Sequence, residues 1–90
     1  MTVMNVTAKR YTATGACGVN RVRLAAVQVT TSGAARLTLT DGSGGATKLD
    51  LDFVANDTFH ITIPGDGILF DKDPQITALT AISAVTLFFM

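Results

Sequence analysis

A two-residue alternation of apolar and polar side chains is the feature that most constrains this sequence. In the segment 48–53 every second residue is Leu or Phe, and the others are Lys or Asp. A strand with one buried face has this period, whereas a helix does not. The segment 35–40 alternates in the same way, and the glycine-rich stretch 41–45 separates the two. This arrangement predicts a β-hairpin with a flexible tip.

The rest of the chain has the same character. Further extended runs are expected over 3–12, 19–31, 58–63, 68–70, 75–80 and 82–90, with turns between them, including one at 32–34. All seven acidic residues are Asp, which favours turns, and none is Glu, which favours helices. We therefore predict one all-β domain over residues 1–90, an antiparallel, jelly-roll-like β-sandwich of seven to eight short strands. The side chains expected to face its core are Val6, Val22, Leu24, Leu37, Leu39, Leu49, Leu51, Phe53, Phe59, Ile61, Ile63, Phe70, Val85, Leu87 and Phe89.

Two local irregularities are expected within this pattern. In the run 19–31, Val22 and Leu24 have one parity, while Val27 and Val29 have the other, which indicates a β-bulge or bend near Ala25-Ala26. After the strand 58–63, a structural turn is expected at Pro64, Gly65, Asp66 and Gly67. Pro fixes φ and Gly accepts a positive φ, so this turn is predicted to reverse the chain into a short strand over 68–70.

Composition limits the possible partners. The chain has 90 residues, of which 16% are charged, with no net charge and a mean hydropathy of +0.39. Its basic residues are scattered, so we expect no nucleic-acid partner. A charged-then-apolar leader is missing and the apolar stretch 78–90 is short, so we expect neither a signal peptide nor a membrane partner. A small, apolar chain of this kind often completes its burial in an oligomer.

Residues able to carry catalysis are scarce. His60 is the only histidine and Cys17 the only cysteine, and both are expected to be structural. Zinc would need several such ligands. Calcium would take Asp oxygens, such as those of Asp66, Asp71 and Asp73, but the order of an EF-hand loop is missing. We therefore predict a protein that is not an enzyme and has no catalytic, cofactor-binding or metal-binding residues.

The last run of the chain has an unusual second face. Val85, Leu87 and Phe89 are expected to fill the core, which leaves Phe88 and Met90 on the outer face. The outer face of a sandwich strand is normally polar. We therefore predict an interface formed by Ile82, Phe88, Met90 and His60.

Three motifs in residues 35–90 resemble small virion proteins of tailed bacteriophages. They are the hairpin D-G-S-G-G-A-T-K-L-D-L-D-F, the turn I-T-I-P-G-D-G-I-L-F and the ending A-V-T-L-F-F. The similar proteins are β-sandwich structural proteins of the head-decoration or appendage type. The chain departs from their pattern at 71–74, where a Gly often stands, and at its Phe89-Met90 end. The resemblance implies a structural role in the virion, with assembly in the host cytoplasm.

Two functions from different classes follow. The first is a capsid decoration (cement) protein without enzymatic activity that self-associates, with a trimer favoured by the resemblance, and docks on the major capsid protein. The alternative is a small β-sandwich module that binds a carbohydrate or calcium. An assembly protein offers apolar strands at its surface, whereas a binding module offers aromatic rings or carboxylates converging on one loop end. The sequence favours the first.

Overall fold

The computed structural model describes residues 6–54, 57–65 and 67–90, and in these ranges the chain forms strands and no helix. No helix in them could therefore cross a membrane. The strands are β1 (Thr7–Tyr11), β2 (Gly15–Ala16), β3 (Val22–Asp41), β4 (Thr47–Phe53), β5 (Thr58–Thr62), β6 (Ile68–Phe70) and β7 (Pro74–Phe89). Every pairing between them is antiparallel. The predicted all-β class is confirmed.

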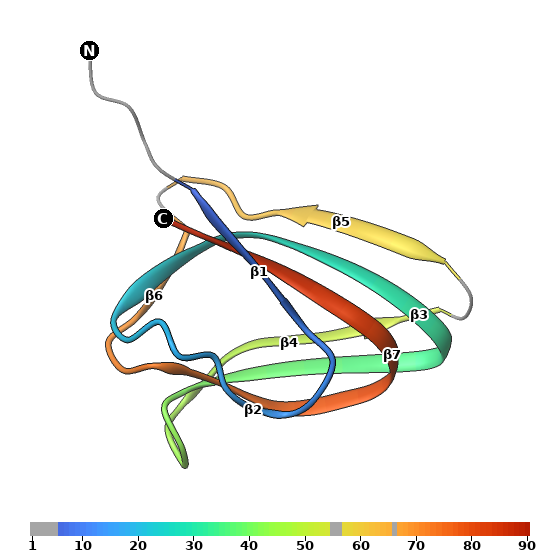
Figure 1. The fold of residues 1–90 in the computed structure, drawn as a ribbon, viewed down its shortest axis with the longest axis horizontal. Helices are drawn as coiled ribbons and strands as arrows, with labels where there is room; N and C mark the ends of the chain where they lie inside the picture. The colour runs from blue at the N-terminus through green and yellow to red at the C-terminus, as the bar shows by residue number, and fades with distance from the viewer. Residues whose placement is uncertain (1–5, 55–56, 66) are drawn as a thin grey trace.

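Two long strands, β3 and β7, form the centre of the molecule and stay paired through a shared bend (Figure 1). The segment 24–31 pairs with 82–89, and 36–41 pairs with 74–80. The bend divides one folded sheet into two layers. In the first layer, which we call the β5 layer, the paired segments 24–31 and 82–89 are flanked by β1, β5 and β6. In the second, the β4 layer, the paired segments 36–41 and 74–80 are flanked by β2 and β4. The sandwich is thus made by one sheet folded on itself.

Because β3 and β7 continue through the bend, the chain does not reverse direction at two places where a break was predicted. Thr31 lies opposite Ile82 and Arg36 opposite Thr80, so the segment 32–35 spans the outside of a corner that Ala81 alone spans on β7. Ala81 has a φ of 54°, and the Ser32 hydroxyl donates to its carbonyl at 3.2 Å. The predicted turn at 32–34 and the predicted division of 75–90 into two strands are therefore wrong. Each strand bends without reversing because its partner bends with it.

The core lies between the two layers and comes mainly from β3 and β7. Of the predicted inward residues, seven are at most 2% exposed: Leu24, Leu37, Leu39, Phe70, Val85, Leu87 and Phe89. Seven more are only half-buried: Val22, Leu49, Leu51, Phe53, Phe59, Ile61 and Ile63. Val27 and Val29 are fully buried as well, and β3 shifts register between Leu24 and Ala26. The bulge predicted near Ala25-Ala26 is confirmed: Ala25 is the extra residue, and it lets Leu24 and Val27 share the core face.

Val6 was expected in the core but is 53% exposed. Strand β1 lies at the sheet edge, paired with β7 so that Tyr11 is opposite Val85. Tyr11 packs against the core, so the residues of β1 two and four positions before it also lie on the inward face. Val6 has the opposite parity and therefore points outward.

The Pro-Gly segment also differs from its prediction. Gly65 has the expected positive φ, 69°. However, β5 and β6 do not pair with each other; both lie antiparallel to β3 and so run in the same direction. The Ile63 amide still donates to the Ala25 carbonyl at 2.9 Å, after which the segment makes an offset beside the β3 bulge. The predicted reversal is wrong because β3 continues to supply hydrogen-bond partners on both sides of the turn. Asp66, a predicted turn residue, lies outside the described residues.

Candidate interaction surface

An apolar strip crosses the outer face of the β5 layer, on the side away from the core. Phe88 on β7 is flanked by Ala8 on β1 and by Ala26 on β3. Met90 and Leu69 form a second row beside Phe88, one on each side of Arg23. Arg23 exchanges backbone hydrogen bonds with Met90 and is opposite Leu69 on β6. We call Ala8, Ala26, His60, Leu69, Phe88 and Met90 the Phe88 surface.

Strict alternation at the end of β7 creates this surface. Val85, Leu87 and Phe89 are buried, whereas Phe88 and Met90 between and after them are half-buried on the outer face. This part of the predicted interface is placed as expected. Ile82 is not: it is 8% exposed and belongs to the core. Between Thr30 and Thr31 the register with β7 shifts by one extra residue, Ser83, and this bulge turns Ile82 inward.

His60 joins the Phe88 surface from β5. It lies opposite Gln28 on β3, with its side chain exposed. Its ring meets the Phe88 ring edge-on, with 5.9 Å between ring centroids and 66° between ring planes. This is the edge-to-face arrangement that aromatic pairs prefer, so His60 supports the outward rotamer of Phe88.

A shallow hollow of about 240 Å³ lies at the end of this surface. Its lining consists of Arg21, Val22, Arg23, Leu69 and Met90. Arg21 approaches Asp71 at 3.6 Å between Nε and Oδ1, and both side chains are largely exposed. The lining offers apolar contact and two guanidinium groups, but no aromatic ring on which a sugar could stack.

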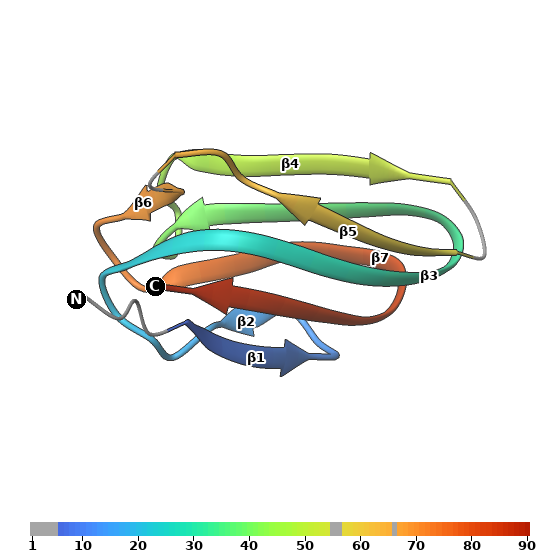
Figure 2. The same ribbon diagram turned by 90° about the horizontal axis from the view of Figure 1, so that it is seen from above.

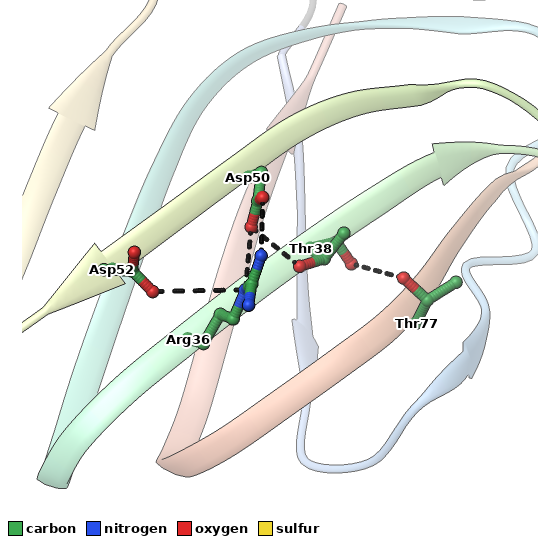
Figure 3. A network of polar contacts seen from close by, with 5 residues as sticks. All are labelled: Arg36, Thr38, Asp50, Asp52 and Thr77. Carbon is green, nitrogen blue, oxygen red and sulfur yellow. Dashed lines mark hydrogen bonds and ion pairs between the residues drawn. The ribbon is translucent and has the colours of Figure 1, made fainter.

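The outer face of the β4 layer is polar. Figure 3 shows Arg36 of β3 between Asp50 and Asp52 of β4. Arg36 donates to both Asp50 oxygens, at 3.1 Å from Nε and 2.8 Å from Nη2, and the Thr38 hydroxyl donates to the same carboxylate at 3.0 Å. Asp52 is 4.0 Å from Arg36 Nε. The Arg36 hydrogen bonds hold the pKa of Asp50 below its usual value.

Sequence reasoning did not identify this network, although the signal was present. Once 35–40 and 48–53 are placed in one hairpin, a register that aligns their leucines puts Arg36 opposite Asp52 and Thr38 opposite Asp50. These cross-strand neighbours share one face.

A second polar cluster closes the segment between β2 and β3. Asp73 accepts backbone N–H bonds from Gly18, Val19 and Asn20 at 2.9, 2.7 and 3.1 Å. The Tyr11 hydroxyl donates to the Cys17 carbonyl at 2.7 Å. Asp73 thus fills an amide nest that would otherwise suit an anion, and the cluster fastens this segment to the start of β7.

The two nucleophile and base candidates are far apart in the topology. Cys17 is 5% exposed and directly follows β2, where its amide donates to the Pro74 carbonyl on the β7 side of the sheet. His60 lies on β5, beyond β3 at the other edge. Burial raises the pKa of the Cys17 thiol to about 11, so it is protonated at neutral pH. The structure does not bring Cys17 and His60 together as a catalytic pair.

Acidic side chains are likewise dispersed. In the described parts of the chain no three His, Cys, Asp or Glu residues come close enough to hold a metal ion. Asp71 and Asp73 have the separate partners Arg21 and the 18–20 amides, and Asp66 lies outside those parts.

Comparison of the chain with known protein families, with curated proteins and with solved structures found no match. The fold and its surfaces therefore carry the functional argument.

Proposed function

We propose that the chain is a non-enzymatic structural protein of a bacteriophage particle, of the capsid decoration type. It docks through the Phe88 surface on neighbouring particle proteins such as the major capsid protein. The resemblance of the motifs in residues 35–90 to phage virion proteins supports a role in a phage particle. The outward position of Phe88 and Met90 supports docking through this surface.

The observation that carries the proposal is the contrast between the two outer faces. On the β4 layer, Arg36, Asp50 and Asp52 form a solvent-exposed ion-pair network. On the β5 layer, Phe88, Met90 and Leu69 occupy equivalent outward positions. Grouped apolar side chains on an outer sheet face favour a protein contact.

Burial of the Phe88 surface adds a modest favourable free energy to each docking contact. Full burial of a Phe or Met side chain contributes about 1.5–3 kcal/mol. Phe88 and Met90 are already half-buried, so docking adds about half of that for each, or roughly 1.5–3 kcal/mol together. The hollow beside them can receive one side chain of the partner, and Arg21 and Arg23 at its rim favour an acidic neighbour.

The test is the protein content of purified particles. Particles of the phage that encodes the chain are banded on a density gradient and their proteins quantified by mass spectrometry. The proposal predicts that the chain co-bands with the particle in a fixed ratio to the major capsid protein. Its presence in infected cells but absence from washed particles would overturn the structural role.

A further inference from the structure

Strand β4 forms an edge of the sheet that is separate from the Phe88 surface and has no role in the docking proposed above. Within the described residues, β4 pairs with β3 alone, and Figure 2 shows it along one edge of the molecule. Every second residue of such an edge strand directs its N–H and C=O groups away from the sheet. These groups can accept another strand.

The apolar side chains along this margin are incompletely covered. Leu49, Leu51 and Phe53 of β4 are half-buried, while their neighbours Leu37 and Leu39 on β3 are fully buried. Across the layers, Phe59 and Ile61 of β5 are half-buried too. The Phe53 and Phe59 rings touch, with centroids 5.2 Å apart, and bridge the two layers at one point. A strand added beside β4 would extend the core along its open side.

We propose that β4 pairs with β4 of a second copy of this chain, antiparallel and centred on Asp50. This register places Lys48 opposite Asp52 of the second copy, and Asp52 opposite its Lys48. Leu49 then meets Leu51 of the second copy, so apolar faces join apolar faces. A shift by one residue would put Lys48 beside Leu51 and is excluded by the alternation.

Charge excludes one of the remaining registers, and the length of the paired segment disfavours the other. Centring on Leu51 would place Asp50 opposite Asp52 twice and leave Lys48 without an acidic neighbour, which is unfavourable. Centring on Leu49 would use only 47–51 of the strand. Centring on Asp50 uses all of Thr47–Phe53 and sets a single Asp50 pair at the two-fold axis. Each of those carboxylates is already neutralised by its own Arg36.

In this pairing Lys48 forms an ion pair with Asp52 of the second copy. It is exposed, and within the described residues it makes no ion pair. Two cross-strand Lys48–Asp52 contacts per dimer follow from the symmetry, because a two-fold interface uses each residue twice. The pairing is independent of a role in a virion, and it predicts a dimer in solution where the phage resemblance favoured a trimer.

A charge swap tests the register. Sedimentation equilibrium should show a wild-type dimer, and Lys48→Glu or Asp52→Lys alone should weaken it about tenfold, because each change makes two contacts repulsive. The double variant Lys48→Glu/Asp52→Lys should restore the wild-type dissociation constant. Lys72→Glu, an exposed charge change outside β4, is the matched control and should leave it unchanged. Circular dichroism verifies that each variant is folded.

A disulfide test locates the axis. In a Cys17→Ser background, Asp50→Cys should form a disulfide-linked dimer on mild oxidation, because facing residues of antiparallel strands lie within disulfide range. Lys48→Cys in the same background should not, since the two copies of residue 48 lie four residues apart along the pair. A wild-type monomer or trimer, failure of the double swap to restore the dimer, or equal cross-linking at both positions would overturn the proposal. Loss of binding to particles with the dimer intact would instead count against the proposed function alone.

Discussion

At the scale of single residues, two glycines in the segment between β5 and β6 have different reasons to be glycine. Gly65 has a φ of 69° and open space where a side chain would start. Gly67 has a φ of 78°, and a Cβ there would overlap the carbonyl of Leu24. Only Gly67 is therefore fixed both by its backbone conformation and by close approach to β3.

This difference predicts unequal costs. Gly65→Ala should destabilise the fold by about 1–2 kcal/mol, the cost of a left-handed L-residue. Gly67→Ala should cost clearly more, because the Leu24 carbonyl must also move. Thermal melts measure both, at about 4–8 °C per kcal/mol for a domain of this size. Equal shifts for the two variants would contradict the close approach at Gly67.

Cys17 predicts a pH dependence. Its pKa rises from an ordinary 9.0 to about 11 through burial, so the unfolded chain loses the thiol proton first as the pH rises. The stabilisation is fully present below about pH 9 and is lost as the pH approaches 11. Between about pH 8 and about pH 10.5, this group should remove about 2 kcal/mol from the free energy of unfolding.

Urea unfolding at the two pH values measures this loss. Burial also raises the pKa of Tyr11, which adds a decline of the same sign at still higher pH. Cys17→Ala should therefore flatten the decline in part. An identical pH profile for wild type and Cys17→Ala would show that the thiol titrates alike in both states.

Phe88 and Phe89 are neighbours in sequence with opposite roles. Phe89 is 2% exposed in the core, and Phe89→Ala should cost about 3–5 kcal/mol. Phe88 is half-buried on the outer face, so Phe88→Ala should cost no more than about 1–1.5 kcal/mol. Chemical denaturation of the two variants compares them directly, and a larger cost for Phe88→Ala would place the core on the other face of β7.

At the scale of elements, alternation predicted the local structure well. The hairpin of β3 and β4 and the bulge near Ala25-Ala26 follow from side-chain parity, since a two-residue period has only two faces to choose between. The outward placement of Phe88 and Met90 follows for the same reason. The bounds of β6 follow instead from a short apolar run after a turn signal.

Chain direction was harder to predict, because a turn signal specifies φ and ψ at a few residues only. Pro64-Gly65 offsets the chain along β3, and Ser32-Gly33 lies on a bend of one continuous strand. In both places a partner distant in sequence decides whether the chain reverses. Ile82 was misplaced for a related reason: Ser83 forms a bulge only because β3 turns the corner beside it.

At the scale of the whole molecule, folding one sheet on itself separates its surfaces. The bend in β3 and β7 (Figure 1) separates two outer faces. The Phe88 surface lies on that of the β5 layer, and the Arg36–Asp50 network on that of the β4 layer. The edge of β4 shares Asp50 and Asp52 with this network but is separate from the Phe88 surface. A change to the Phe88 surface should therefore leave the other two intact.

In the proposed function, the Phe88 surface docks the chain on a particle. If the proposed phage origin holds, the most direct measurement is co-sedimentation of the purified protein with phage particles that lack the chain, prepared from a deletion mutant of its gene. We predict saturable binding of the wild type and at least tenfold weaker binding of Phe88→Ser/Met90→Ser, since about 1.4 kcal/mol corresponds to a factor of ten. Val54→Ser is the matched control, because it removes a side chain 69% exposed outside that surface and should bind like the wild type. Wild-type affinity of the folded double variant would show that the Phe88 surface is not the docking site.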